Sequence, residues 1–209
     1  MGWWTEHVVP HLADRSLSTG PVMRLRGEAV TGLGGRVLEI GFGSGRNAAL
    51  YPEAVESVDA VEPSDVGWRM SERARAACPV PVARVGLDGQ RLEAEDASYD
   101  AVLSTFTLCT IPDVARALAE VRRVLRPGGS LHFLEHGRSP DPQVASWQRR
   151  LDPVQRRVAG GCHLSRDVPA LVEAAGLTPA TLAAAYLPGP AAGRPWTYVY
   201  RGRAVGSTR

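Results

Sequence analysis

The chain of 209 residues contains no lysine, so all 24 of its basic residues are arginine. The absence of lysine excludes enzymes that form a Schiff base, Walker-type loops with their phosphate-binding lysine, and any lysine general base. The arginine bias, with abundant alanine, glycine and proline, is typical of a high G+C coding sequence. Arginine richness alone is therefore weak evidence for phosphate binding.

Cysteine and long apolar runs are also scarce. Cys78, Cys109 and Cys162 are an odd number at wide spacings, which fits neither a disulfide framework nor a CxxC metal site. No apolar run approaches ~18 residues, and the N-terminal segment is acidic where a signal peptide is basic. We therefore expect a soluble, cytoplasmic protein in a reducing compartment, with no stable membrane insertion.

No strong charge of either sign is present, because 24 basic and 22 acidic residues give a formal net charge of +2. This balance predicts no nucleic-acid partner. His7 and His11 share a helical face but have no third ligand in sight, so no metal is expected. The length fits one domain over 1–209. Oligomeric state is not determined by these features, and a homodimer stays open.

Short apolar runs alternate with helical stretches from about residue 36 onward, which predicts an α/β fold. Helices are expected to begin near Arg46 or Asn47, at Pro63 and Ser64, and after Asp113 as an N-cap. The expected strands are 36–40, 58–62, 81–87, 99–104 and 130–135.

The tail beyond residue 137 predicts two or three short helices and then two strands. Asp152 and Pro153 are expected to start one helix, and Ser165 to cap the last one. Residues 177–187 and 196–203 are expected to form a closing hairpin.

Glycines at every second position follow the first strand in VLEIGFGSG at 37–45. A dinucleotide-binding GxGxxG loop has its third glycine where Arg46 stands, whereas Gly41, Gly43 and Gly45 place it one residue earlier. Glu39 precedes the first glycine by two residues, where it would repel a pyrophosphate and attract an ammonium group. These features favour S-adenosylmethionine, which carries an amino-acid end, a ribose and an adenine but no phosphate.

Three further positions fit such a cofactor. Glu62, about 20 residues after the glycines and next to Pro63, is placed to accept both ribose hydroxyls. Asp88 and Gly89 follow the third strand, where Asp88 could accept from the adenine amino group. An Asp-Gly turn without a ligand is the alternative for that pair, and a helix N-terminal carboxylate is the alternative for Glu62.

The chain resembles the class I S-adenosylmethionine-dependent methyltransferases, in particular the group that includes the ubiquinone and menaquinone methyltransferases. The resemblance covers about half the chain and is carried by VLEIGFGSG at 37–45, VDAVEPS at 58–64, LDGQRLEAEDASYDAVLS at 87–104 and EVRRVLRPGGSLHFLEHG at 120–137. A weaker likeness, to the thiol methyltransferases of the methyltransferase-like group, comes from LEHG at 134–137 and Gly-Gly-Cys at 160–162.

The resemblance implies a Rossmann-like seven-stranded sheet of order 3-2-1-4-5-7-6 with helices on both faces. It also implies a cap at 1–35, a cofactor-binding core at 36–137, a helical insert at 138–165, and the last helix and hairpin at 166–209. Glu39 and the glycines would then serve the methionine end, Glu62 the ribose, and Asp88 and Gly89 the adenine. Ser104 and Thr105 would lie beneath the sulfonium.

The expected reaction is methylation of a small molecule, at a thiol or an oxygen, with S-adenosylhomocysteine as the product. Methyl transfer depends chiefly on proximity and alignment, so a dedicated catalytic residue is not required. His136, directly after the fifth strand, and His163 are the candidate bases. C-methylation of a quinone-like acceptor, a nicotinamide-dependent oxidoreductase and a non-catalytic scaffold are the alternatives.

Overall fold

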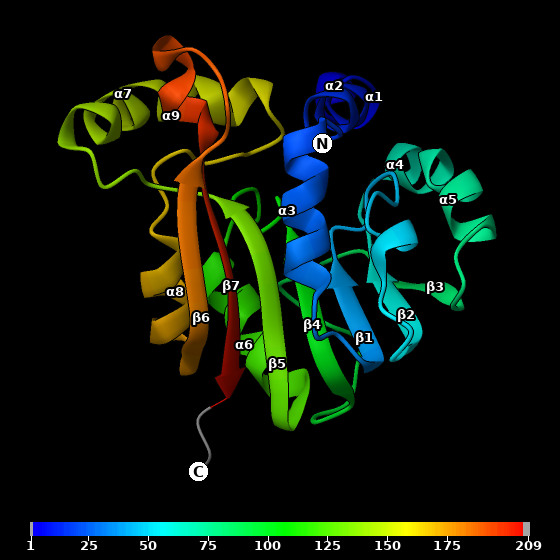
Figure 1. Ribbon diagram of the computed structural model, residues 1–209. Helices are drawn as coiled ribbons and strands as arrows, with labels where there is room; N and C mark the ends of the chain where they lie inside the picture. The colour runs from blue at the N-terminus through cyan, green and yellow to red at the C-terminus, as the bar shows by residue number, and fades with distance from the viewer. Residues whose placement is uncertain (1, 207–209) are drawn as a thin grey trace.

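A single sheet runs through the protein, and the computed structural model describes residues 2–206 of it (Figure 1). The strand order is β3-β2-β1-β4-β5-β7-β6. The first five strands pair in parallel, and β7 is antiparallel to both β5 and β6. The expected order and the closing hairpin are thereby confirmed. The strands are β1 (Gly35–Ile40), β2 (Val55–Val61), β3 (Val82–Gly86), β4 (Tyr99–Thr105), β5 (Leu125–His136), β6 (Leu177–Tyr186) and β7 (Tyr198–Gly206).

Helices pack on both faces of this sheet. One face carries α3 with the short turn η1, and the opposite face carries α6 and α8 (Figure 1). The helices are α1 (Trp3–His7), α2 (Val9–Ser16), α3 (Gly20–Val30), η1 (Ala48–Leu50), α4 (Asp65–Met70), α5 (Glu72–Ala76), α6 (Val114–Val124), α7 (Pro142–Val158), α8 (Val168–Ala174), η2 (Ala191–Gly193) and α9 (Arg194–Thr197).

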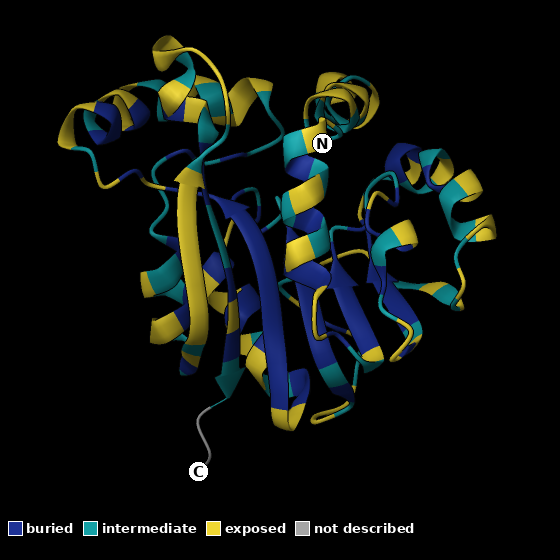
Figure 2. Cartoon of the chain, in the orientation of Figure 1, coloured by how far each residue is buried: buried dark blue, intermediate teal, exposed yellow. Residues whose placement is uncertain are grey.

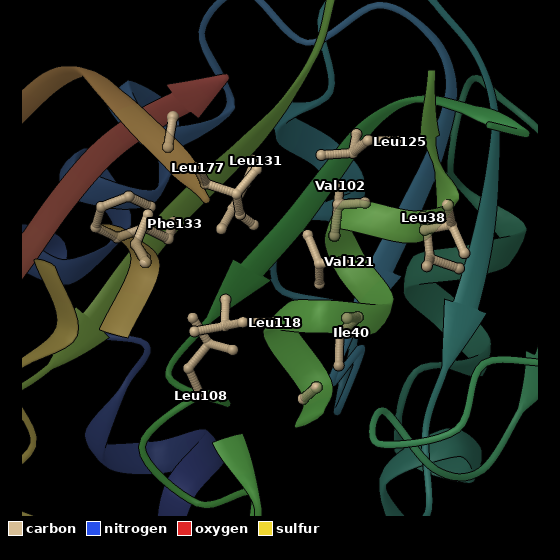
Figure 3. Packing of buried hydrophobic residues seen from close by; sticks show 14 of the residues in the cluster. Leu38, Ile40, Val102, Leu108, Leu118, Val121, Leu125, Leu131, Phe133 and Leu177 are labelled. Carbon is tan, nitrogen blue, oxygen red and sulfur yellow. The ribbon is translucent and has the colours of Figure 1, made fainter. Parts of the chain in front are cut away.

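The larger core lies between the sheet and α6. Leu118 and Val121 on this helix are fully buried against strand residues such as Leu38, Val102 and Leu131 (Figure 3). The central strands are buried along nearly their whole length, whereas β6 is exposed along most of its length (Figure 2). This fits the near-continuous apolar sequence of parallel strands covered on both faces.

Several helix boundaries differ from those expected from the sequence. The segment after the glycine loop forms only the short 3₁₀ turn η1, because Pro52 disfavours helical backbone at Tyr51. The helix expected from Pro63 is two helices, α4 and α5, which meet at Ser71. The Ser71 hydroxyl donates to the Trp68 carbonyl within this junction.

In the tail, α7 begins after Asp141 and continues through Pro153, so Asp152 and Pro153 start no helix. The carboxylate of Asp152 instead accepts the Leu164 and Ser165 N–H groups. The N-cap of α8 is Asp167 rather than Ser165. Trp196, expected in the last strand, lies in α9.

The expected subdivision at 1–35, 36–137, 138–165 and 166–209 remains a prediction, and Met1 and residues 207–209 lie outside the described residues. No helix within residues 2–206 combines the length and apolar character needed to cross a membrane. Over the same range, no group of three or more His, Cys, Asp or Glu side chains is arranged to hold a metal ion.

Candidate functional site

The glycine loop turns sharply at the carboxyl end of β1. Gly41, Gly43 and Gly45 have φ values of +79°, +55° and +76°, which a residue with a Cβ adopts only under strain. A Cβ at Gly41 would overlap the Thr107 side chain, whereas a Cβ at Gly43 would point into open space. The loop thus presents bare backbone around Gly43, the opening that close approach of a ligand requires.

Glu62 connects this loop to the end of β2. Its Oε2 accepts the Gly43 N–H at 2.6 Å, and its Oε1 accepts the Ser64 N–H at 2.7 Å. Burial raises the pKa of Glu62, and these two backbone donors oppose the increase. Each carboxylate oxygen can accept a second hydrogen bond, so the group still has acceptor capacity for a pair of hydroxyls. Pro63 is exposed between Glu62 and the N-cap residue of α4, Ser64.

Glu39 is fully buried beneath the loop. It accepts hydrogen bonds from the Tyr51 hydroxyl and from Asn47 Nδ2, the latter at 2.8 Å. Burial raises the pKa of Glu39 to about 7 against the lowering effect of both donors. The carboxylate therefore orders Asn47 and Tyr51, and its expected contact with an ammonium group remains a prediction.

Arg26 is a candidate site residue that the sequence-based expectations did not include. It is buried on α3, and its Nη1 donates to Asn47 Oδ1 at 3.0 Å and to Thr105 Oγ1 at 2.7 Å. Its Nε is buried without a hydrogen-bond partner, so the guanidinium has an unused donor beside the loop. Arg26 lies on the face of α3 that also buries Val22, Ala29 and Val30. An arginine at the helical spacing of these apolar residues could have identified it from the sequence as a buried charged residue.

Ser104 and Thr105 lie at the carboxyl end of β4, as expected. Ser104 Oγ donates to Glu135 Oε1 at 2.7 Å, and Thr105 Oγ1 also accepts from Asn47 Nδ2 at 3.0 Å. Glu135, which sequence analysis did not single out, is completely buried and accepts the N–H groups of Thr107 and Cys109. Burial raises the pKa of Glu135. This side chain fixes the loop that follows β4.

Asp88 and Gly89 follow β3 at the same edge of the sheet. Asp88 is exposed and accepts from both the backbone N–H and the side-chain amide of Gln90, which lowers its pKa. A Cβ at Gly89 would press on Ile40 at 2.9 Å. The pair thus forms an Asp-Gly turn against the end of β1, and its adenine-binding role remains a prediction.

The two candidate bases have different surroundings. The Nε2 of buried His136 faces the Trp196 carbonyl, and its Nδ1 lies 3.7 Å from Cys162 Sγ. Burial would lower the pKa of His136, but Cys162 and the carbonyl raise it overall. Both ring nitrogens are therefore engaged within the protein.

His163 lies near the loop after β4, because its backbone N–H donates to the Cys109 carbonyl at 2.8 Å. Its Nδ1 is 3.3 Å from Asp152 Oδ2, and burial followed by the charge of Arg166 lowers its pKa. The lowered pKa favours the neutral form of the His163 imidazole. With Nδ1–H oriented toward Asp152, Nε2 is the basic nitrogen.

The N-terminal helices close over the loop from the other side. Asp14 on α2 accepts from Ser44 and forms an ion pair with Arg46 at 2.5 Å. Trp4 on α1 donates from Nε1 to the Val158 carbonyl at the end of α7, at 3.0 Å. The N-terminal segment and α7 therefore meet above the carboxyl edge of the sheet (Figure 1).

Comparison with known proteins agrees with this geometry. Residues 38–133 match the methyltransferase domain family. The chain is 34% identical over 137 residues to thiol S-methyltransferase TMT1B of Rattus norvegicus, covering 63% of this chain and 55% of the relative. The corresponding Homo sapiens protein is 34% identical over 148 residues, covering 67% and 59%. The chain therefore spans less than two thirds of these relatives.

Among solved structures, a SAM-dependent methyltransferase from Methanosarcina mazei superposes with a TM-score of 0.64 at 17% identity. The match covers 83% of this chain and 93% of that one. At this identity the likeness supports the fold, while the matched residues 38–133 include the glycine loop, Glu62 and the carboxyl end of β4. The chain therefore contains a methyltransferase domain at residues 38–133, on a fold shared with S-adenosylmethionine-dependent methyltransferases.

Proposed function

We propose that the protein transfers the methyl group of S-adenosylmethionine to a small-molecule thiol. One observation carries the proposal: the Gly43 N–H of the strained glycine loop donates to Glu62, and the space next to Gly43 is open. This is the cradle that a ribose and an amino-acid moiety need. The names of the mammalian relatives support sulfur as the acceptor atom.

The residues present fit the cofactor in three places. Glu62 would accept the ribose hydroxyls with its remaining lone pairs, and Asp88 with Gly89 would address the adenine. Arg26, whose guanidinium lies against Asn47 and Thr105, would bind the carboxylate of the methionine end. When bound, the sulfonium supplies an activated methyl group for in-line displacement. The protein then contributes alignment, for which model reactions suggest up to ~7–11 kcal/mol.

His163 would take the proton from the acceptor thiol. A free thiol has a pKa near 8.5, so only a small fraction is ionised at neutral pH and a base increases the reactive thiolate. The lowered pKa of His163 favours its unprotonated form, and Asp152 orients the ring. The same arrangement would serve O-methylation, for which the need for a base is greater. His136 is less suited, because both its nitrogens are engaged.

The test measures methyl transfer to a small alkyl thiol and to the alcohol of the same shape. We expect methylation of the thiol, and a loss of about 10²-fold in kcat/KM at pH 7 for His163→Asn. This loss should shrink above pH 9, where the thiol ionises without help. His11→Asn, on an exposed part of α2, is the matched control. Absence of thiol methylation would overturn the proposal, and a pH-independent defect would remove His163 from the chemistry.

A non-catalytic scaffold is separated from the enzyme by the same experiment. A scaffold of this fold would bind S-adenosylmethionine without turning over any acceptor. Methylation of the alcohol in preference to the thiol would favour the O-methyltransferase alternative, and methylation of a quinone alone would favour C-methylation.

A further inference from the structure

Two of the three cysteines lie together at the carboxyl edge of the sheet. Cys109, in the loop after β4, and Cys162, in the segment after α7, have their Sγ atoms 3.6 Å apart. His136, at the end of β5, lies beside Cys162 with Nδ1 3.7 Å from its Sγ. We call these three residues the dithiol cluster. Cys78, the third cysteine, lies elsewhere and contacts the Ala48 carbonyl.

A backbone hydrogen bond joins the two segments that carry the pair. The residue after Cys162 donates its backbone N–H to the carbonyl of Cys109 at 2.8 Å. This hydrogen bond holds the segment after α7 against the loop after β4, directly beside the two sulfurs. A disulfide requires an Sγ–Sγ distance of about 2.05 Å, so the two sulfurs, now 3.6 Å apart, must approach each other by about 1.5 Å.

The two thiols differ in reactivity and in access. Hydrogen bonding from Cys109 and the neighbouring His136 imidazole lower the pKa of Cys162, whereas hydrogen bonding with Cys162 and burial raise that of Cys109. Because His136 faces Cys162, a negative charge is better stabilised on the sulfur of Cys162 than on that of Cys109. Cys162 also retains 9% exposure against 2% for Cys109. A small oxidant thus meets the thiolate first.

We propose that the dithiol cluster is a site of reversible oxidation, at which hydrogen peroxide converts Cys109 and Cys162 into a disulfide. In the first step the Cys162 thiolate attacks a peroxide oxygen, so that an S–O bond forms, the O–O bond breaks and hydroxide leaves. Cys109 then attacks the Cys162 sulfenic acid, the S–S bond forms, and the S–O bond breaks. The proton of Cys109 leaves with the hydroxide as water.

The electrons balance across these two steps, since the two thiols lose two electrons and two protons and the peroxide becomes two waters. A small-molecule thiol reverses the change by thiol–disulfide exchange. The disulfide would link the segment after α7 to the loop after β4. Cys162 directly precedes His163, and the Cys109 carbonyl accepts the His163 backbone N–H. Oxidation would thereby hold this end of the site in one arrangement.

The test uses the reduced full-length chain, treated with hydrogen peroxide, alkylated with N-ethylmaleimide under denaturing conditions and measured by intact mass. The expected product carries one alkyl group and lacks two hydrogens, whereas the reduced protein carries three alkyl groups. Because cleavage at arginine separates the three cysteines into peptides 76–84, 92–116 and 158–166, the linkage is read directly. The expected crosslink joins 92–116 to 158–166.

Single variants supply the controls. Cys78→Ser should form the disulfide at the unaltered rate, and Cys162→Ser should react at least about tenfold more slowly with peroxide. Cys109→Ser should stop at a sulfenic acid on Cys162, trapped by dimedone. A crosslink that involves Cys78, equal oxidation of all three thiols, or no disulfide while the protein stays folded by circular dichroism would each overturn the proposal.

Discussion

At the scale of single residues, the glycine loop offers a matched pair of substitutions. Gly41 and Gly43 both have positive φ, but a Cβ at Gly41 overlaps Thr107 and a Cβ at Gly43 meets nothing. We expect Gly43→Ala to cost only the backbone strain, roughly 1–2 kcal/mol of unfolding free energy. Gly41→Ala should cost about 2 kcal/mol more, because overpacking is added. Urea denaturation measures both, and equal losses would contradict the assigned contact.

Glu62 provides the second prediction at this scale. Replacing it by alanine removes the carboxylate that accepts the Gly43 N–H and that we propose accepts the ribose hydroxyls. We expect Glu62→Ala to weaken binding of S-adenosylmethionine and S-adenosylhomocysteine at least about 10²-fold, as two charge-assisted hydrogen bonds are lost. Isothermal titration measures this, with NADH as the negative ligand.

Glu56→Ala is the control, because Glu56 is exposed near the other end of β2. Its binding constant should equal that of the unmodified protein. Unchanged affinity in Glu62→Ala would mean that the ribose is held elsewhere.

At the scale of elements, the N-cap residue of α8 differs from the one expected from the sequence. Asp167 accepts the Ala170 N–H and also pairs with Arg138 at 2.6 Å, whereas Ser165 makes no cap. Asp167→Asn keeps a capping oxygen and loses the charge, so its difference from Asp167→Ala isolates the cap. We expect Asp167→Ala to be less stable than Asp167→Asn by about 1 kcal/mol.

Ser165→Ala should leave the unfolding free energy within about 0.5 kcal/mol of the unmodified protein. Thermal or urea denaturation of the three variants decides the matter. A larger loss for Ser165→Ala than for Asp167→Ala would restore Ser165 as the cap.

Elements whose signal is local could be predicted from the sequence. The strands β1 to β5 follow from short apolar runs. Helix α6 follows from its apolar spacing and from Asp113, whose side chain accepts the Arg116 N–H in the first turn of the same helix. The length of α7 could not be predicted, because Asp152 is a good N-cap in isolation but is engaged by Leu164, twelve residues away. Pro153 therefore lies inside α7 and does not begin a new helix.

The same limit applies to the site. The glycines follow β1 and Glu62 follows β2. Because these two strands are expected to be parallel neighbours, the proximity of the glycines and Glu62 could be predicted. Arg26 and Glu135 act through partners 79 and 31 residues away in the chain, Thr105 and Ser104. Such pairings depend on how α3 and β5 pack against β4, which residue spacing does not encode.

At the scale of the whole molecule, stability should depend on pH through Glu39. Burial raises the folded-state pKa of Glu39 from 4.5 to about 7, so between these values the folded protein holds a proton that the unfolded chain releases. The stabilising contribution is thus complete below pH 4.5 and is lost as pH rises through 7. Raised pKa values at Glu62 and Glu135 act with the same sign, and the lowered values at His132 and His163 act with the opposite sign.

Glu39→Gln isolates this contribution, because every other titrating group is present in both proteins. We expect the unfolding free energy of the variant, relative to the unmodified protein, to rise between pH 5 and 7 by up to about 1.4 kcal/mol per pH unit, the value for one proton. Urea denaturation at half-unit steps measures the two curves, with Glu56→Gln as the exposed control that should run parallel to the unmodified protein. Parallel curves for Glu39→Gln would mean that Glu39 is ionised in the folded protein, stabilised by Arg26, Asn47 and Tyr51. The buried cluster would then carry a permanent negative charge opposite the guanidinium.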